Sequence, residues 1–547
     1  ENCMKVLIIG GVAAGTKIAA KLKREDRSVE VTILTKGNDI SYAGCGLPYY
    51  VGDVIHDKES LVVNTPEKFE KLTGARVVTN TEAIKVDRMA KKVETRNEAD
   101  GERASYEYDK LVIAVGASPI QPQCDGLKLK NVFYMRTPED AVSLREAVDS
   151  GEIRKAVVVG GGFIGLEVAE NLNAKGVKVS VIDFAQTILP GFLDPEFAGY
   201  VESKMADEGV MCFTGVALEG ILGTDKVEKV QTSRRAMKAD ACILAMGIRP
   251  NTAFLQDSGI EMFKGTILTN QYLQTSDPDI YAAGDCAMVT NRITGAPQWS
   301  PMGSTANIAG RIAAMNLSGK EISYPGVLGT GVAKLPGINI GRTGLNEQAA
   351  KDAGYDVETV VTVVDDKAHY YPGAGSFIMK MIADKTSHRL LGLQVLGSGA
   401  VDKVVDIAVT AISMKACLED LQCMDFAYAP PFSTAIHPFE HTVNIMLNKL
   451  SGNLESAAPA AYAAGAYEDY TVVDAGITPA IKGAPYIDLT AVDGPLEGFG
   501  KEDKLLLVCT KGKRAYMVQN RMKYFGYTDT KVLEGGLTFN TGVNEEE

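Results

Sequence analysis

The stretch Lys155-Ala-Val-Val-Val-Gly-Gly-Gly-Phe-Ile-Gly165 decides the fold of this chain. An apolar strand runs into a glycine-rich turn, and a helix and a second strand follow in residues 166–182. Gly160, Gly162 and Gly165 match Gly-x-Gly-x-x-Gly, in which glycine permits a tight turn and a close backbone approach to a pyrophosphate at the helix start. The stretch therefore predicts a dinucleotide-binding α/β domain.

The residue after the second strand indicates which nucleotide this turn would bind. Asp183 stands at the strand end, where a carboxylate accepts hydrogen bonds from a ribose diol. Phe184-Ala-Gln186 follows and offers no arginine for a 2′-phosphate, so we expect NADH in preference to NADPH. The alternative is a strand–helix turn without a nucleotide.

A similar unit lies near the amino end, in Lys5-Val-Leu-Ile-Ile-Gly-Gly-Val-Ala-Ala-Gly15. Gly10 and Gly15 are the first and last glycines of the pattern, but Val12 stands where the middle glycine is expected. The next strand ends in Thr35-Lys36 instead of an acid. Two such units predict an α/β protein with two Rossmann-like, doubly wound domains.

Length, charge and cysteine content restrict the possible functions. The chain has 547 residues, 46% of them hydrophobic, which is enough for three or four domains. Its net charge of −13 argues against nucleic acid or an anionic membrane as the main partner. Without an apolar run of about 18 residues or a signal-peptide pattern, we expect a cytoplasmic protein. The nine cysteines are scattered and include no Cys-x-x-Cys, which predicts reduced thiols and no metal site.

The second half of the chain has a different pattern. Its first part predicts an α+β block, with strands at 330–341, 357–364, 375–384 and 390–397 and a helix at 401–414. Residues 451–465 are rich in Ala, Ser and Gly and predict a linker. Beyond it, strands at 470–473 and 504–509 and a helix at 514–525 predict a small α/β domain.

Three further stretches, one between the two glycine turns and two after the second, carry motifs of their own. Thr275-Ser-Asp-Pro-Asp-Ile-Tyr-Ala-Ala-Gly-Asp285 predicts a strand that ends in Gly-Asp just before a helix. The other two are Tyr108-Asp-Lys-Leu-Val-Ile-Ala-Val-Gly-Ala-Ser-Pro119 and Cys242-Ile-Leu-Ala-Met-Gly-Ile-Arg-Pro-Asn251. They resemble, in this order, the flavin motif and the two domain crossings of flavoproteins with two dinucleotide folds.

This resemblance implies FAD on the first domain and NADH on the second. The aspartate that matches Asp285 binds the ribityl chain of FAD in that family. The cofactor-binding residues implied in this chain are Gly10, Gly15, Ser41, Gly116, Gly160, Gly162, Gly165, Asp183, Gly247 and Asp285.

Ser41-Tyr-Ala-Gly-Cys-Gly-Leu-Pro-Tyr-Tyr50 contains Cys45 between a strand and a predicted helix start. A thiolate is the nucleophile in disulfide exchange, and a helix amino end or a cation lowers a thiol pKa. Disulfide reductases use Cys-x4-Cys, but the equivalent positions here are Ile40 and Tyr50, so no local resolving cysteine exists. The pattern resembles coenzyme A disulfide reductases and their NADH oxidase and peroxidase relatives, which implies a catalytic Cys45; the alternative is a buried structural thiol.

Two tyrosine segments resemble the dimerisation domain of coenzyme A disulfide reductases. They are Lys367-Ala-His-Tyr-Tyr-Pro-Gly373 and Phe426-Ala-Tyr-Ala-Pro-Pro-Phe-Ser433. In that subfamily, tyrosines matching Tyr371 (or Tyr370) and Tyr428 reach the active site of the other subunit, where a phenol can protonate a departing thiolate. The alternative is that both tyrosines pack a proline-rich turn.

Thr434-Ala-Ile-His-Pro-Phe-Glu-His441 departs from that pattern and resembles the His-Pro segment of the two-cysteine reductases. There the histidine is the acid/base, because imidazole titrates near neutral pH. The resemblance implies a catalytic His437, although Glu440 does not stand at the spacing of the glutamate that orients it. The alternative is a simple His-Pro turn.

Leu505-Leu-Leu-Val-Cys-Thr-Lys-Gly-Lys-Arg514 resembles the active-site loop of rhodanese sulfurtransferases. Such a loop surrounds a persulfide on Cys509 with backbone N–H donors at a helix amino end. Residues 501–524 hold seven basic and two acidic side chains, which makes this loop locally positive. The preceding residues 470–489 lack the typical Asp-Val-Arg, so the alternative is a module that only binds or docks.

As a whole, the chain resembles a coenzyme A disulfide reductase fused to a rhodanese domain. The resemblance implies an FAD-binding domain in residues 1–115 and 250–325, an NADH-binding domain in 116–249, an α+β dimerisation domain in 326–450, a linker in 451–468 and a small rhodanese-like α/β domain in 469–547. It also implies a homodimer.

We therefore predict an FAD-dependent NADH oxidoreductase that reduces coenzyme A persulfide, polysulfide or coenzyme A disulfide through Cys45, with Cys509 handling sulfane sulfur. Lys21, Lys23 and Arg24 are candidates for binding coenzyme A phosphates, unless they are ordinary surface charges. The rival functions are an NADH oxidase or peroxidase that cycles a cysteine sulfenate, and a redox-sensing flavoprotein without turnover.

Overall fold

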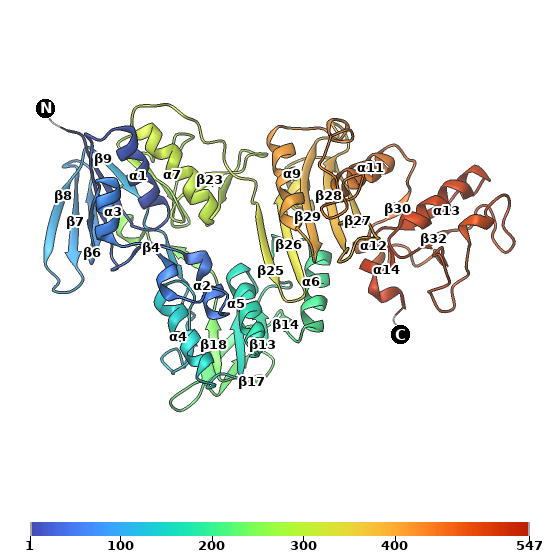
Figure 1. Cartoon of the computed structure of the whole chain (residues 1–547), viewed down its shortest axis with the longest axis horizontal. Helices are drawn as coiled ribbons and strands as arrows, with labels where there is room; N and C mark the ends of the chain where they lie inside the picture. The colour runs from blue at the N-terminus through green and yellow to red at the C-terminus, as the bar shows by residue number, and fades with distance from the viewer. Residues whose placement is uncertain (1–2, 545–547) are drawn as a thin grey trace. The chain divides into compact units, whose positions relative to one another are not determined.

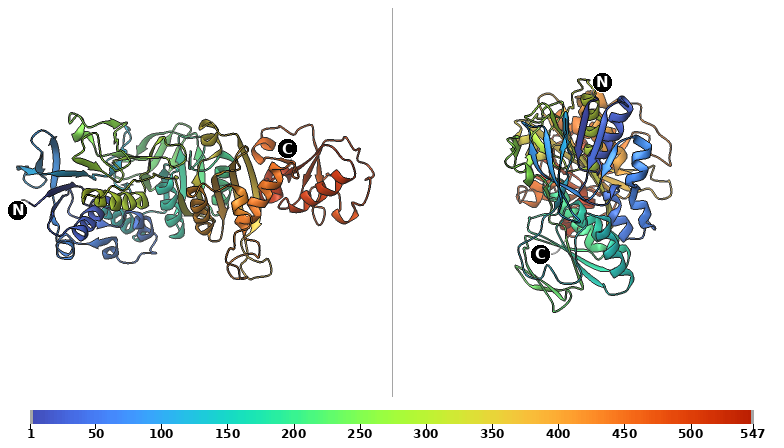
Figure 2. Two further views of the ribbon diagram at one scale, coloured as in Figure 1. Left: turned by 90° about the horizontal axis from the view of Figure 1, so that it is seen from above. Right: turned by 90° about the vertical axis from the view of Figure 1, so that its left-hand side faces the viewer.

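The computed structural model describes residues 3–544, and the chain forms two compact units (Figure 1, Figure 2). The first unit extends to Gln186 and includes Gly209–Val327. The second unit comprises Thr187–Glu208 and the chain from Leu328 onward. Among the described residues, no helix is both long and apolar enough to cross a membrane.

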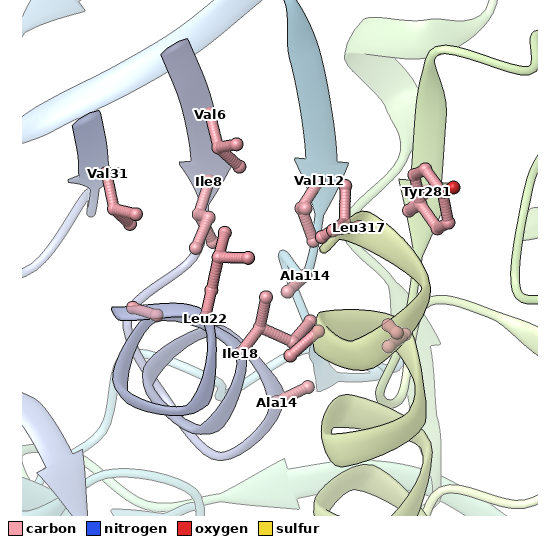
Figure 3. Close-up of a cluster of buried hydrophobic side chains, with 14 of the residues drawn as sticks. Val6, Ile8, Ala14, Ile18, Leu22, Val31, Val112, Ala114, Tyr281 and Leu317 are labelled. Atoms are coloured by element: carbon pink, nitrogen blue, oxygen red, sulfur yellow. The ribbon is translucent and has the colours of Figure 1, made fainter. Parts of the chain in front are cut away.

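Strand β1 (Lys5–Ile9) is the middle strand of a parallel sheet in the first unit. Val6 and Ile8 face a core shared with helices α1 and α7 (Figure 3), whereas Leu7 and Ile9 face a core shared with β6 and β7. Burial of both faces explains the uninterrupted apolar run. The sheet order is β22 (Ile280–Ala282), β9 (Lys110–Ile113), β1, β2 (Glu30–Leu34) and β5 (Arg76–Val78); α1 (Ala14–Glu25), α3 (Pro66–Thr73) and α7 (Gly303–Leu317) are its helices; β6 (Thr81–Asp87), β7 (Lys92–Asn97) and β8 (Arg103–Glu107) form an antiparallel sheet.

The second glycine turn belongs to a second parallel sheet, so the two predicted doubly wound domains are confirmed. Its order is β11 (Val132–Phe133), β18 (Ala241–Leu244), β12 (Lys155–Val159), β13 (Lys178–Asp183) and β14 (Met211–Thr214), with helices α4 (Pro138–Asp149) and α5 (Phe163–Ala174) and the antiparallel sheet β15 (Leu218–Leu222), β16 (Lys229–Thr232), β17 (Ala236–Lys238). The two predicted crossings lie side by side, because β10 (Ala117–Pro119) pairs antiparallel with β19 (Ile248–Pro250).

Short elements complete the first unit. They are the ribbons β3 (Ile40–Tyr42) with β4 (Val62–Asn64), β20 (Met262–Phe263) with β21 (Thr266–Ile267) and β23 (Met288–Thr290) with β24 (Pro297–Trp299), and helix α2 (Leu47–Val51).

The predicted α+β block of the second unit is an antiparallel sheet with α9 packed on β26 and β29 (Figure 1). The single strand predicted at 330–341 is wrong, because Pro336-Gly337 makes a turn and divides it into two paired strands. The sheet order is β25 (Gly331–Leu335), β26 (Ile338–Gly344), β29 (Leu390–Gly397), β28 (Ser376–Asp384) and β27 (Val357–Asp365); its helices are α8 (Glu347–Asp352), α9 (Val401–Ser413), α10 (Leu418–Leu421) and α11 (Pro438–Leu450).

Helix α6 (Pro195–Asp207) falls within the predicted NADH-binding domain, 116–249, and its residues are part of the second compact unit. The buried ammonium of Lys380 on β28 lies 2.8 Å from Asp194, 2.5 Å from Glu196 and 3.1 Å from Glu347. These three carboxylates have the spacing of a metal site, but Lys380 supplies their cation. A buried charge needs its partners, so this cluster holds α6 on the sheet.

The carboxyl-terminal domain is a four-stranded parallel sheet. The linker predicted at 451–468 is wrong in its first half, because Leu454 enters the core and β30 pairs with β33. Small residues fit there since strand pairing uses only the backbone. The order is β30 (Ser456–Ala457), β33 (Thr530–Leu533), β32 (Leu505–Val508) and β31 (Thr471–Asp474), with helices α12 (Pro459–Ala463), α13 (Lys513–Tyr524) and α14 (Gly536–Phe539).

Candidate active site

The first glycine turn forms one wall of a cavity of 660 Å³ in the first unit. Gly10 has a φ of +114°, and a Cβ there would lie 1.9 Å from the carbonyl oxygen of Ala114; a Cβ on Gly15 would lie 1.9 Å from the carbonyl oxygen of Gly10. The turn itself therefore requires both glycines. Gly116 and Asp285 line the same cavity. The backbone turn, the carboxylate and the volume fit the FAD that the sequence predicts.

Asp285 is paired with a residue that the sequence analysis did not select. The guanidinium of Arg136 lies 3.0 Å from its carboxylate, and the indole N–H of Trp299 donates to its backbone carbonyl at 2.8 Å. The helix predicted directly after Asp285 is wrong, because the hairpin β23–β24 follows and α7 begins only at Gly303. The missed signal is the turn-forming stretch Asn291-Arg-Ile-Thr-Gly295.

Two other predicted cofactor residues have a positive φ. Ser41 has a φ of +51°, and its N–H donates to the carbonyl oxygen of Gly11 at 3.1 Å, so it supports the first turn. Its neighbour Tyr42 lines the cavity. Gly247 has a φ of +99° at the return crossing. Direct cofactor contacts of Ser41 and Gly247 stay predictions.

The second glycine turn repeats the geometry of the first. Gly160 has a φ of +116°, and its Cβ would lie 1.9 Å from the carbonyl oxygen of Ala245; a Cβ on Gly165 would lie 1.9 Å from the carbonyl oxygen of Gly160. Gly162 differs, because a Cβ there would meet no protein atom within 4 Å. Packing therefore does not require glycine at position 162, whereas close approach of a pyrophosphate does.

Asp183 connects the end of β13 with this turn. Its carboxylate accepts hydrogen bonds from the N–H groups of Gly161 at 2.7 Å and Ala185 at 2.8 Å. The next residue, Phe184, is exposed and brings no positive charge. This geometry fits a carboxylate that would accept hydrogen bonds from a ribose diol.

Cys45 lies in a short 3-10 turn, Gly44–Gly46, and is exposed. A Cβ on Gly303 would lie 3.8 Å from its Sγ, so the thiol is at the amino end of the 15-residue helix α7. We expected the helix after Cys45 to act on the thiol, but α2 has only five residues. The dipole of a longer helix stabilises a thiolate more effectively.

The pKa of the Cys45 thiol reflects opposing effects. Desolvation raises this pKa, and the charges of Glu167 and Asp285 raise it further, while Arg136 lowers it. The expected net lowering of the Cys45 pKa is therefore not what the side chains produce. Glu167 on α5 is itself unusual, because burial raises its pKa to about 7. The effects of Glu167 and Arg136 on Cys45 cannot be predicted from the sequence around Cys45, because both residues belong to other elements.

Glu167→Gln should make Cys45 more reactive above pH 7. Below pH 7 the Glu167 carboxyl is largely protonated and has no charge, whereas above pH 7 its carboxylate opposes formation of the thiolate. We expect alkylation of Cys45 at pH 8 to be about 2- to 5-fold faster in this variant and unchanged at pH 6. The rate is measured by mass spectrometry of the Cys45 peptide. Equal rates at pH 8, or the same increase in Glu170→Gln, would contradict this coupling.

The two tyrosine segments meet in the second unit. The phenols of Tyr370 and Tyr428 are hydrogen-bonded, and this contact raises the pKa of Tyr428. Tyr371 is half-buried, and its N–H donates to the carbonyl oxygen of Ala368 in a turn. The structure thus brings Tyr370, the stated alternative to Tyr371, beside Tyr428. The catalytic role of either phenol stays a prediction.

His437 has a structural role that the sequence did not distinguish from a catalytic one. It is the N-cap of α11, where its Nδ1 accepts the N–H of Phe439 at 3.1 Å. Its ring packs on Phe426 with centroids 4.8 Å apart and is 3% exposed. Burial, together with Lys403 and His441, lowers the pKa of His437 to about 4. A neutral, capped imidazole does not support the predicted acid/base role.

Cys509 lies just after β32 and is 3% exposed. Its Sγ accepts hydrogen bonds from the N–H groups of Gly512 at 3.0 Å and Ala515 at 3.3 Å, at the amino end of α13. Such donors stabilise an anionic sulfur. Arg514 lies in the same loop, and its guanidinium donates to Asp488 at 3.2 Å. Sulfur transfer by Cys509 stays a prediction.

Asp474 is a residue of this domain that the sequence analysis missed. It ends β31, it is buried, and its carboxylate accepts N–H bonds from Gly476 at 3.0 Å, Ala480 at 2.6 Å and Ile481 at 2.8 Å. It therefore fixes the loop that follows β31, beside the strand that carries Cys509. The acid at the end of an apolar strand, Val473-Asp474, was the available signal.

The three basic residues considered for coenzyme A are not equivalent. The ammonium of Lys23 donates to the carbonyl oxygens of Arg27 and Val29, each at 2.8 Å. Lys21 pairs with Glu25 at 2.6 Å, whereas Arg24 is exposed. Lys23 therefore stabilises the turn that follows its own helix. A ligand contact remains a prediction for Lys21 and Arg24.

Two dinucleotide-binding turns, a cavity that fits a flavin and the exposed thiol of Cys45 at the amino end of α7 define a nucleotide-dependent oxidoreductase. A family model described as pyridine nucleotide-disulphide oxidoreductase matches residues 4–305, and one described as its dimerisation domain matches residues 334–438. The chain belongs to the pyridine nucleotide-disulphide oxidoreductase family. Membership implies FAD and a pyridine nucleotide as cofactors.

Two similar proteins each align with 79% or more of the chain. An "NAD(P)H sulfur oxidoreductase (CoA-dependent)" of Pyrococcus abyssi is 39% identical over 79% of this chain and 96% of its own length. An "NADH oxidase" of Methanocaldococcus jannaschii is 34% identical over 82% of this chain and 100% of its own.

Two solved structures cover nearly all of the chain. An "NAD-Dependent Persulfide Reductase from A. fulgidus" is 34% identical and covers 98% of this chain and 100% of its own, with a TM-score of 0.92. "Reduced Bacillus anthracis CoADR-RHD" is 30% identical and covers 99% and 98%, with a TM-score of 0.93. The resemblance inferred from the sequence is confirmed, including the rhodanese-like carboxyl-terminal domain.

Proposed function

We propose that this protein is an NADH-dependent reductase of coenzyme A persulfide or polysulfide, with coenzyme A disulfide as a related substrate, that acts through Cys45. The observation that carries the proposal is the environment of a second cysteine. The Sγ of Cys509 accepts two backbone N–H bonds at a helix end. Backbone donors around a sulfur suit an anionic persulfide, which reduction of a disulfide or of oxygen does not form on a second cysteine.

The chemistry at Cys45 follows from thiol–disulfide exchange. The Cys45 thiolate attacks the coenzyme A sulfur of the persulfide, forms a mixed disulfide and expels hydrosulfide. The glycine turns at Gly10 and Gly160 would hold FAD and NADH, which would supply the two electrons needed to cleave this mixed disulfide to two thiolates. The amino end of α7 and Arg136 stabilise the Cys45 thiolate. Tyr428, hydrogen-bonded to Tyr370, donates a proton to the departing thiolate.

The proposed assembly is a homodimer. A group of exposed apolar side chains in and around residues 424–436 of the second unit, called the patch below, supports it, since exposed apolar groups of this kind mark interaction sites. The patch contains Tyr370, Met424, Tyr428, Phe432 and Ile436. Both tyrosines of the proposed proton donor lie in the patch, so a dimer interface there would bring them to a second copy. The match to a dimerisation domain model supports the same assembly.

The second candidate function is an NADH oxidase, because a relative of that name is 34% identical. In that case Cys45 cycles between thiolate and sulfenate. Anaerobic NADH oxidation that depends on coenzyme A persulfide, with little NADH-driven oxygen consumption, would exclude the oxidase.

Intact-mass analysis of the purified protein tests the proposed partner of Cys45. We expect a fraction to carry an adduct of coenzyme A mass, because the mixed disulfide accumulates when NADH is absent. Dithiothreitol should remove the adduct completely. Peptide mapping should place it on Cys45 and not on Cys423, which is also exposed. An adduct on another cysteine, or none after incubation with coenzyme A disulfide, would contradict the proposal.

A further inference from the structure

A second cavity, of 360 Å³, lies in the second unit between the dimerisation sheet and the rhodanese-like domain. Its walls are the edge strand β27, one face of α11 and the loop Lys511–Lys513 before α13. On α11 it is lined by His441, Asn444, Ile445 and Asn448, which stand at positions i, i+3, i+4 and i+7 of the helix and so share one face. The space is therefore bounded by regular elements of two domains.

The two carboxylates that line this cavity already have partners. Glu534 accepts the N–H of Val361 at 2.8 Å and lies 2.7 Å from the ammonium of Lys449. Asp365 lies 2.6 Å from the ammonium of Lys511. These contacts join β27 to the rhodanese-like domain on both sides of the cavity. They also neutralise the two negative charges that would repel an anion.

The groups left to bind a ligand are mainly donors. Lys513 is exposed at the first position of α13, where its charge adds to the amino end of that helix. Asn444 and Asn448 contribute amide groups. Burial and the charge of Lys513 lower the pKa of His441, although the charge of Asp365 raises it. On the edge strand, the next outward N–H is that of Val363.

The remaining lining is apolar. It consists mainly of Val360, Ile445, Leu454, Tyr516 and Val532. A donor-rich, positively charged end beside an apolar wall is complementary to a molecule with one acidic group and a compact apolar body.

We propose that this cavity binds a small organic anion, an aliphatic carboxylate or sulfonate. Its acidic group binds Lys513 and the amino end of α13, and its apolar part packs on Ile445 and Leu454. The bound anion contacts Gly512, whose N–H holds the sulfur of Cys509, so it bridges the two domains beside the sulfur loop. The site is separate from the flavin cavity and from Cys45, and it does not depend on the proposed reductase function.

Calorimetry on the full-length, flavin-loaded protein tests the site with hexanoate and hexanesulfonate as probes. Both should bind at one site per chain. Inorganic phosphate has no apolar part and hexanol has no acidic group, so each should bind at least about 10-fold more weakly. Lys513→Gln should weaken binding of both probes by about 10-fold or more, because a charge-assisted hydrogen bond is lost. Asn448→Leu should weaken it as well.

Lys501→Gln is the matched control, since Lys501 is an exposed lysine of the same domain outside the cavity; binding should not change. Melting curves confirm that each variant folds. Three results would overturn the proposal: no binding of either probe, equal binding of phosphate and hexanesulfonate, or binding that Lys513→Gln and Asn448→Leu leave unchanged.

Discussion

Replacing Cys45 by serine should lower persulfide-dependent NADH oxidation by at least about 10⁴-fold, as expected for loss of a catalytic nucleophile. A serine hydroxyl is not ionised at neutral pH and cannot form the sulfur–sulfur bond of the mixed disulfide. Cys286 in the first dinucleotide domain and Cys242 in the second do not replace it, because both are buried and burial raises their pKa values. The rate is measured anaerobically from NADH absorbance with coenzyme A persulfide.

Two observations separate loss of the thiol from loss of the fold. Cys45→Ser should still bind flavin and NADH, because neither glycine turn is altered, so NADH should still bleach the flavin absorbance. Cys423→Ser, which removes another exposed thiol, should keep wild-type turnover within about 2-fold. Persulfide-dependent turnover that survives in Cys45→Ser would show that the proposed mechanism is wrong.

The glycine turns were predictable because local sterics dictate them. At Gly10 and Gly160 the positive φ and a carbonyl oxygen 1.9 Å from a hypothetical Cβ leave glycine as the only residue that fits. The strand, turn and helix around each are contiguous in sequence, so hydrophobic pattern and turn chemistry both point to the same fold. The two Rossmann-like domains followed from this agreement.

The environment of Cys45 was not predictable, because it is assembled from distant segments. The thiol lies close to Gly303 at the start of α7, and its pKa responds to the charges of Arg136 and Glu167. These residues are far from Cys45 in the sequence and come near it only in the folded protein. The sequence around each of these residues does not indicate that it lies near Cys45. A pKa depends on the sum of such contacts, so the sequence suggested a lowered thiol pKa where desolvation and Glu167 raise it.

The sequence could not decide between neighbouring residues or between two roles of one residue, for a related reason. Tyr370 and Tyr371 are neighbours, and only the turn geometry shows that Tyr370 meets Tyr428. A His-Pro step fits both an acid/base and a helix N-cap, and burial of His437 favours the cap. The buried ion-pair cluster of Lys380 could not be predicted from the sequence, because its three carboxylate partners come from outside its strand.

Gly160→Ala and Gly162→Ala should have opposite consequences although the two glycines lie in one turn. At Gly160, alanine meets the carbonyl oxygen of Ala245 at 1.9 Å and must adopt a φ of +116°. Left-handed strain and overpacking together cost about 2–5 kcal/mol. We expect a lower melting temperature and poor recovery of folded protein, measured by circular dichroism and yield.

At Gly162 the added methyl group meets no protein atom within 4 Å, and the residue has extended backbone, so the melting temperature should stay at the wild-type value. The methyl group instead occupies the space that a pyrophosphate needs, which should raise the KM for NADH by about 10- to 100-fold, since small displacements in a nucleotide site have effects of this size. Flavin content should not change, because the flavin turn is a separate one. A Gly162→Ala enzyme with normal KM for NADH would show that this turn does not hold the nucleotide, whatever the fold around it.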